Sequence, residues 1–384
     1  HTTSEPVWMA AKSSGHDIPR DSQQFVNCSV EKNFIGKQTI MYGRHNEIES
    51  VNKDSFSGLS SSLTFLWLND NKITSIETGA FSQMPELTRL HLENNKLTSI
   101  QPGVLRGLHK LDGLFLEENE LTSVSKNDFK GLISLRILNL HHNQIASIES
   151  GAFSDLSQLE QLDLRKNQLT RIDSGVFNGL SNLKRLDLSG NKIIVPGSFE
   201  KLHELTHLHL EYNLVSKILP GTFRGLKALT ALFLDYNSLT NIFKGDFDDL
   251  DSLQMLNLQF NEIADIEPGS FDNLSSLRKL NLRRNKLTHI TVGIFDKLAK
   301  LYDLDLSYNF IDIVDPAAFN SGNIESFHFI HNNLSDINEN IYGSSKTEFR
   351  VFDRFILLFS PFSIFLFFSF NFKKNDFSDE DLED

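Results

Sequence analysis

The stretch "LDLRKNQLTRIDSGVFNGL", residues 162–180, places Asn167 among leucines where an ordinary helix or strand would carry an apolar residue. The same phrase returns as "LHLENNKLTSI" at 90–100, "LNLHHNQIASI" at 138–148 and "LNLRRNKLTHI" at 280–290. Nine of the twelve spacings between its asparagines are 24 residues, and the others are 25, 22 and 23. A fixed period with L-x-x-L-x-L-x-x-N-x-L inside it predicts a repeat solenoid.

The recurring asparagine has a structural explanation. Each L-x-L run predicts a short strand, and successive units place these strands side by side in a parallel sheet. Where the chain then turns inward, buried backbone N–H and C=O groups lack a strand partner, and an amide side chain can both donate to and accept from them. We therefore predict a buried ladder, not a binding site, formed by Asn71, Asn95, Asn119, Asn143, Asn167, Asn191, Asn213, Asn237, Asn261, Asn285 and Asn309.

A second column of the repeat is aromatic. Ten residues past most asparagines stands a phenylalanine, which predicts a spine of stacked rings. Leu105 replaces it once, and Phe199 keeps its place although the unit after Asn191 is two residues short. That deletion should remove a turn on the convex side and leave the sheet continuous. The spine consists of Phe56, Phe81, Phe129, Phe153, Phe177, Phe199, Phe223, Phe247, Phe271, Phe295 and Phe319.

Residues 39–337 resemble the 24-residue animal extracellular class of leucine-rich repeats, on the phrase L-x-x-L-x-L-x-x-N-x-L-x-x-I-x-x-G-x-F-x-x-L. Toll-like, Slit-like, acid-labile-subunit-like and mosquito immune ectodomains are of this class. The resemblance implies an α/β repeat solenoid: a curved right-handed horseshoe with a parallel concave β-sheet of about 12 strands and a mostly irregular convex side. It also implies non-catalytic binding of a partner, usually on the concave face.

The chain divides into six parts. We expect a disordered leader at 1–24, the remnant of an N-terminal cap at 25–45, the solenoid at 46–337, a C-terminal boundary at 338–354, a Phe-rich apolar segment at 355–372 and an acidic tail at 373–384. Caps of this family normally carry several cysteines, whereas Cys28 is the only cysteine here, so we expect either caps rebuilt without disulfides or a sequence that is incomplete at both ends. This thiol allows an intermolecular bridge, hence a homo- or heterodimer, or is buried and free.

The segment "FILLFSPFSIFLFFSFNF" at 355–372 has three interpretations. It contains no charge and just reaches the length of a membrane span, with Lys373 and Lys374 following it. It could instead cover the apolar end of the last coil. The third interpretation is a gene-model artefact, because Phe, Ser, Leu and Pro are all encoded by pyrimidine-rich codons. Membrane attachment is therefore left open.

Composition and motifs argue against several functions. The net charge is −13 with both signs mixed throughout, so we expect no nucleic-acid partner. The predicted concave positions show no repeated Ser–His–Asp arrangement, phosphate loop or H-E-x-x-H motif, so we expect no enzyme and no cofactor. His207, His209 and Glu211, with Asp187 and Asp235 on the neighbouring strands, are the best metal candidates. We interpret them as exposed side chains of a solvated sheet and predict no metal site.

Compartment is indicated by the repeat class and by three glycosylation sequons, which begin at Asn27, Asn273 and Asn333. Both favour a protein that is secreted or lies on the extracellular face of the plasma membrane.

Aromatic residues gather in the middle of the predicted concave sheet. Tyr212, Tyr236 and Phe260 each precede a ladder asparagine in three consecutive coils, so their side chains should stack along one edge of the sheet. An exposed aromatic cluster is typical of a partner site, although these rings could merely shield the ladder. The predicted site for a protein partner, in innate immunity or cell adhesion, comprises His209, Tyr212, Phe233, Tyr236, Met255 and Phe260.

An alternative function is a matrix or carrier scaffold that holds partners by charge. Lys279, Arg283 and Arg284 form the one basic strand and are the predicted anion contacts under this reading.

Overall fold

The computed structural model describes residues 4–6, 29–33, 38–56, 62–193, 199–315, 317–319, 324–333 and 349–350. Cys28, the sequon at Asn27 and the Phe-rich segment 355–372 lie outside these residues, as does most of the expected leader. Ser4–Pro6, within that leader, forms a strand. Among the described residues, no helix is long and apolar enough to cross a membrane.

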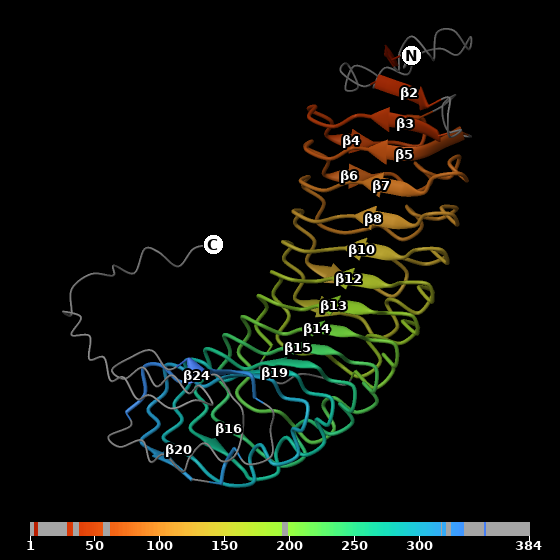
Figure 1. Cartoon of the computed structure of the whole chain (residues 1–384). Helices are drawn as coiled ribbons and strands as arrows, with labels where there is room; N and C mark the ends of the chain where they lie inside the picture. Colours follow the sequence, from red (N-terminus) through yellow and green to blue (C-terminus); the bar gives the residue numbers. More distant parts are fainter. Residues whose placement is uncertain are drawn as a thin grey trace, which may run out of the picture.

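A curved sheet runs through the whole described chain (Figure 1). Its sixteen described strands follow chain order: β1 (Ser4–Pro6), β2 (Ser29–Asn33), β3 (Gln38–Tyr42), β5 (Leu63–Trp67), β7 (Arg89–His91), β8 (Gly113–Phe115), β10 (Ile137–Asn139), β12 (Gln161–Asp163), β13 (Arg185–Asp187), β14 (His207–His209), β15 (Ala231–Phe233), β17 (Met255–Asn257), β19 (Lys279–Asn281), β21 (Asp303–Asp305), β23 (Ser326–His328) and β24 (Phe349–Arg350). The β1–β2 and β2–β3 pairs are antiparallel, and every later pair is parallel. The expected parallel solenoid is confirmed.

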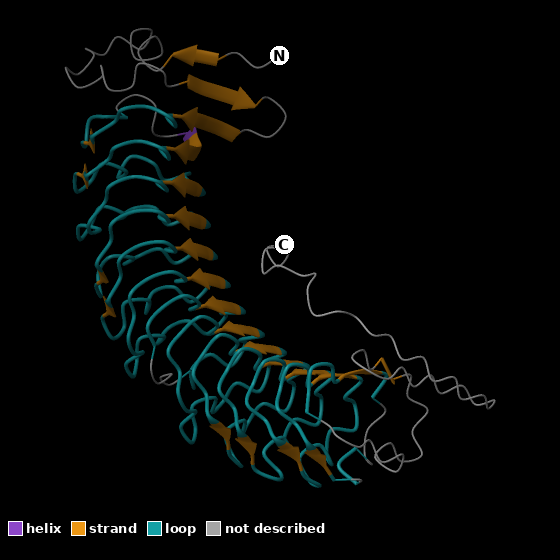
Figure 2. Ribbon diagram, turned by 90° about the vertical axis from the view of Figure 1, so that its left-hand side faces the viewer, coloured by secondary structure: helices purple, strands orange, loops and turns teal. Residues whose placement is uncertain are grey.

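The outer side of the arc is mostly irregular (Figure 2). Its described strands are two residues long and form four parallel pairs: β4 (Ser50–Val51) with β6 (Ser75–Ile76), β9 (Ser123–Val124) with β11 (Ser147–Ile148), β16 (Asn241–Ile242) with β18 (Asp265–Ile266), and β20 (His289–Ile290) with β22 (Ile313–Val314). The shortened unit leaves the large sheet continuous, as predicted, because Arg185 of β13 pairs with His207 of β14. The turn expected to be lost there lies at 194–198, outside the described residues.

The asparagines join each coil to the one before it. Asn95 Nδ2 donates to Leu92 O in its own coil and to Leu68 O in the preceding coil, each at 3.0 Å. Its Oδ1 accepts from the backbone N of Ile73 at 2.9 Å. The same set of bonds recurs at every later ladder position, and the eleven side chains from Asn71 to Asn309 are 4–9% exposed. One buried amide thus satisfies backbone groups of two coils at once.

The residue before each ladder asparagine has a left-handed backbone. Its φ is 52° at Asn94, 53° at His142 and 53° at Lys166, and Gly190 occupies the same position with φ 63°. This conformation turns the strand inward, but it costs an L side chain about 1–2 kcal/mol. Every other ladder coil carries this cost, which the ladder bonds and the core below it offset, whereas Gly190 avoids it.

Neighbouring coils lie farther apart in the outer part of the core than on the inner face, and this difference curves the stack. Phenylalanine rings of the spine lie 5.7 Å apart at Phe247–Phe271 and 6.4 Å at Phe271–Phe295. On the inner face, the stacked rings of His209 and Phe233 are only 4.4 Å apart. Because neighbouring coils are closer inside than outside, the solenoid bends toward its large sheet.

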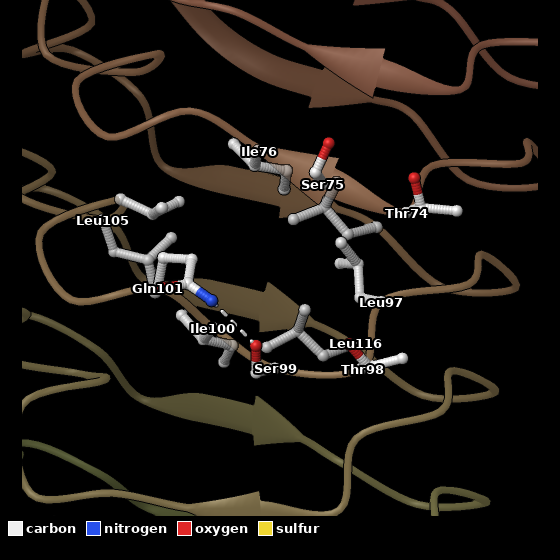
Figure 3. Close-up of a pocket in the computed structure, with 12 residues that line it drawn as sticks. Thr74, Ser75, Ile76, Leu97, Thr98, Ser99, Ile100, Gln101, Leu105 and Leu116 are labelled. Atoms are coloured by element: carbon white, nitrogen blue, oxygen red, sulfur yellow. Dashed lines mark hydrogen bonds between the residues drawn. The ribbon is translucent and has the colours of Figure 1, made fainter.

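The spine has a gap where Leu105 replaces phenylalanine. No ring bridges Phe81 and Phe129 there, and a partly open cavity of about 90 Å³ lies between the neighbouring coils (Figure 3). Leu97, Ile100, Leu105 and Leu116 line it. The leucine is shorter than the ring that the column otherwise carries, so the site is incompletely filled.

Two adjacent asparagines provide a test of the ladder. Asn95 is buried, whereas Asn94 is exposed. We expect Asn95→Ala to lower the free energy of unfolding by about 3 kcal/mol, since three buried backbone groups lose their partner. Asn94→Ala should cost about 1 kcal/mol, through its left-handed backbone. Urea unfolding of both variants measures the difference, and equal losses would contradict the structural role of Asn95.

The cavity provides a second test. Leu105→Phe should restore the spine and raise the free energy of unfolding by about 1 kcal/mol, since it fills space that is already apolar. Leu108→Phe, at a fully packed position of the same coil, should instead destabilise the fold by about 1–3 kcal/mol. A Leu105→Phe protein that unfolds at lower urea than the parent would show that the cavity cannot accept a ring.

Candidate functional site

Three aromatic residues stack along one edge of the sheet. The rings of Tyr212 and Tyr236 are 4.3 Å apart and 10° from parallel, and those of Tyr236 and Phe260 are 4.2 Å apart and 11° from parallel. All three have the left-handed backbone of the position before the ladder asparagine, with φ of 54°, 52° and 52°. That conformation does not itself favour a bulky side chain, so the backbone alone does not explain the rings.

This edge stack is partly accessible, because Tyr212 is exposed whereas Tyr236 and Phe260 are half-buried. Tyr212 is 55% exposed and the next side chain but one, Leu214, is 52% exposed. Tyr212, Tyr236 and Phe260 line one shallow depression together with Glu262 and Arg284. The depression combines ring faces with polar groups at its margin, an arrangement suited to a protein partner.

The other predicted partner-binding residues lie on the inner face of the sheet, not at its edge. His209 of β14 stacks on Phe233 of β15, and its Nδ1 is 3.0 Å from Glu211 Oε1. Met255 lines a separate depression with Lys279 and Asp303. The structure therefore divides the predicted cluster into an edge group and an inner-face group.

A second ring stack, absent from the sequence-based site, occupies the first coils. Tyr42, Trp67, His91 and Phe115 stand four residues before successive asparagines, and their rings lie 6.3, 3.8 and 4.3 Å apart. The guanidinium carbon of Arg44 lies 5.5 Å from the ring centre of Tyr42. The sequence does contain a signal for this stack, because an aromatic residue stands four positions before the asparagine in four successive coils.

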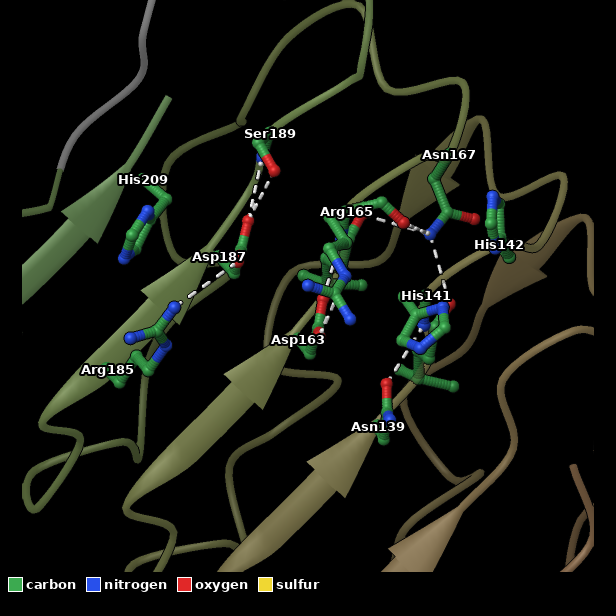
Figure 4. Close-up of polar contacts among 12 residues, drawn as sticks. Asn139, His141, His142, Asp163, Arg165, Asn167, Arg185, Asp187, Ser189 and His209 are labelled. Carbon is green, nitrogen blue, oxygen red and sulfur yellow. Dashed lines mark hydrogen bonds and ion pairs between the residues drawn. The ribbon is translucent and has the colours of Figure 1, made fainter. Parts of the chain in front are cut away.

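The middle of the inner face is polar (Figure 4). Asp163 Oδ1 accepts from the backbone N of Arg165 at 3.1 Å, and Asp187 Oδ1 accepts from that of Ser189 at the same distance. Asn139 does the same for His141 at 3.3 Å. These side chains satisfy the backbone donor two residues on, which gives the polar column a structural purpose.

Burial changes the titration of this polar region. It raises the pKa of Glu117 to about 7, with neighbouring Glu93 and Asp163 adding to the effect. It also raises the pKa of Asp163 and of Asp235 to about 6, helped by Asp187 and Glu211 respectively. Burial and the charge of Arg165 lower the pKa of His141 to about 4.

The expectation that the metal candidates are exposed is wrong, since Asp187 and Asp235 are buried and His207, His209 and Glu211 are half-buried. His209 pairs with Glu211, and His207 Nδ1 lies 3.0 Å from Thr206 Oγ1. Among the described residues, no group of three or more His, Cys, Asp or Glu side chains is arranged to hold a metal ion.

The predicted anion contacts differ in their surroundings. Lys279 Nζ is 3.5 Å from Asp303 Oδ2. Arg283 and Arg284 instead lie over the ring of Tyr308, at 4.3 and 4.8 Å. Of the sequons, Asn273 is exposed and its Nδ2 donates to Asp248 Oδ1, while Asn333 is also exposed.

Family models agree with this architecture. The leucine-rich-repeat model matches eight overlapping segments that together span residues 44–322. The chain belongs to the leucine-rich-repeat family. Proteins of this family are generally non-catalytic interaction modules.

Solved structures of other leucine-rich-repeat proteins are similar. The Leptospira interrogans protein LIC12759 is 29% identical, with a TM-score of 0.65 over 77% of this chain and 73% of that one. Toll in the Drosophila Toll–Spätzle complex is 23% identical, with a TM-score of 0.70 over 78% of this chain and 42% of that one. The mosquito APL1B domain is 23% identical, with a TM-score of 0.62 over 74% and 79%. No curated protein sequence matches.

The raised carboxyl pKa values predict an unusual pH dependence. A carboxyl group whose pKa is higher in the folded chain stabilises the fold fully below its unfolded pKa, and this contribution disappears as the pH rises through 6 and 7. The lowered pKa of His141 has the opposite effect, because it destabilises the fold as the pH falls. This effect begins only below pH 6.5, the pKa of the unfolded chain. We therefore expect the melting temperature to rise as the pH falls from about 8 to about 6.5.

Glu117→Gln should raise the melting temperature at pH 8 by a few degrees and flatten this pH dependence, because a neutral amide is less costly to bury. The exposed Glu120→Gln is the matched control and should change neither. Thermal unfolding followed by circular dichroism measures both. An unaltered pH profile in Glu117→Gln would show that this carboxyl does not cause the effect.

Proposed function

We propose that this leucine-rich-repeat chain is a non-catalytic extracellular recognition module. Its protein partner contacts the edge stack of Tyr212, Tyr236 and Phe260 and the adjoining inner face at His209 and Phe233. The observation that carries the proposal is the stack itself, which places one exposed and two half-buried rings at positions where the backbone conformation disfavours bulky side chains.

The alternative of ladder shielding explains less. Asn95, Asn119, Asn143 and Asn167 are as buried as the asparagines beside the stack, yet Asn94, Glu118, His142 and Lys166 precede them. A ladder that stays buried behind polar residues does not need aromatic shielding. The rings are therefore available for a partner, as expected for clustered aromatic anchors.

A role in innate immunity or cell adhesion, on a secreted or cell-surface protein, is consistent with the neighbours. The solved Toll structure is of a complex with Spätzle, described as a hub in development and innate immunity. The exposed sequon at Asn273 also supports an extracellular location. The charge-dependent scaffold is less well supported, because Lys279 already pairs with Asp303.

Binding partners can be selected from a displayed peptide library and their affinities compared between variants. Tyr236→Ala combined with Phe233→Ala should weaken selected partners about thirtyfold, equivalent to about 2 kcal/mol. This loss should persist at high salt, since ring contacts are not screened.

Lys166→Ala is the matched control, because it places alanine at the same left-handed position, with φ 53°, outside the stack. It should leave affinity unchanged. Selected partners that bind the double variant as tightly as the parent would remove the proposal. A large fall in the melting temperature of the double variant would instead assign the rings a structural role.

A further inference from the structure

An arginine continues the edge stack. Beyond Phe260, the position before the next ladder asparagine is Arg284, whose guanidinium carbon lies 5.0 Å from the ring centre of Phe260 and 4.8 Å from that of Tyr308. The guanidinium thus takes the place of a ring between two aromatic side chains. Its Nε is buried and has no hydrogen-bond partner in the described part of the chain. The packing between the two rings orients this side chain, whose residue is half-buried overall.

A second guanidinium shares the same ring. Arg283, in the same coil, lies with its guanidinium carbon 4.3 Å from the ring centre of Tyr308. Within the described residues, no carboxylate lies within the 4.0 Å ion-pair distance of either arginine. Two like charges against one ring repel each other, and no ion pair described there compensates them.

The nearby lysines are compensated. Lys279 Nζ lies 3.5 Å from Asp303 Oδ2, and Lys286 Nζ lies 3.0 Å from Glu262 Oε2. The free positive charge is therefore confined to the two guanidiniums and does not extend along the sheet. A long polyanion, such as a sulfated glycan, would need a row of available cations. A single carboxylate matches the two planar forks.

The depression beside Arg284 is lined by aromatic rings as well as by the guanidinium. Arg284 lines the depression that also contains Tyr212, Tyr236 and Phe260. A ligand that reaches the guanidiniums therefore has aromatic ring surface beside it. Carboxylate and apolar side chain together are the chemistry of a protein segment.

We propose that Arg283 and Arg284 form an anion subsite for one carboxylate of a protein partner, an Asp, a Glu or a chain terminus, whose adjacent apolar side chain lies on Tyr236 and Phe260. This subsite rests on the proposed recognition function and specifies the chemistry of its partner. The guanidiniums donate hydrogen bonds to the carboxylate, and the rings exclude water from these bonds.

The test uses two capped tripeptides that differ by one charge, acetyl-Phe-Glu-Phe-amide and acetyl-Phe-Gln-Phe-amide, titrated into the whole chain by NMR or calorimetry. We expect the Glu peptide to bind at least tenfold more tightly than the Gln peptide. The double variant Arg283→Gln, Arg284→Gln should abolish this preference and leave the affinity for the Gln peptide unchanged. Arg284→Lys keeps the charge but loses the fork, and should lose most of the preference.

The matched control is Lys279→Gln with Lys286→Gln, which removes the same charge from the paired lysines and should keep the preference. Equal binding of both peptides to the parent overturns the anion subsite but leaves ring recognition intact. Loss of the preference in the lysine control would show a diffuse positive field instead. A heparin hexasaccharide that binds more tightly than the Glu peptide, and weakens equally in both double variants, would identify a polyanion surface. Binding of neither peptide would contradict ring recognition as well.

Discussion

The hydrogen bonds of the buried asparagines are the constraint on which the rest of the molecule depends. Each amide joins three backbone groups in two coils, so it fixes how far apart the coils lie and in which register. The inward turn that it stabilises requires a left-handed residue just before it. That residue projects from the sheet edge at a constant spacing, which is why Tyr212, Tyr236 and Phe260 come into contact. A structural requirement of the backbone thus creates the surface that we propose for binding.

Much of the fold could be predicted from the sequence, because the same pattern of leucine and asparagine recurs in more than ten coils. The parallel sheet and its continuity across the shortened unit follow from the spacing alone. The sequence shows that Leu105 replaces a phenylalanine of the spine. Whether a cavity then forms depends on how far the neighbouring coils move together, and no sequence pattern specifies that movement. Strand β1 could not be predicted, since its three residues have no period.

The candidate site was predictable only in part. The sequence placed Tyr236 and Phe260 in one column at the edge of the sheet, but it joined them into one site with Phe233 and Met255 of the strand interior, and Met255 lines a separate depression. It treated Lys279 and Arg284 as equivalent cations, whereas side-chain packing pairs the former with Asp303 and stacks the latter between rings. Such distinctions depend on side-chain directions, and a one-dimensional pattern does not contain them.

The difference in spacing between the two sides of the arc has a mechanical consequence. On the inner face, the rings of Trp67 and His91 are 3.8 Å apart, already at van der Waals contact, whereas spine rings such as Phe271 and Phe295 are 6.4 Å apart. Closing the horseshoe further would drive the inner rings into repulsion. Opening it meets no ring repulsion, so that only the hydrogen bonds between coils resist it. The molecule should therefore resist compression more than extension, and a partner wider than the arc meets less elastic resistance than one that requires the arc to tighten.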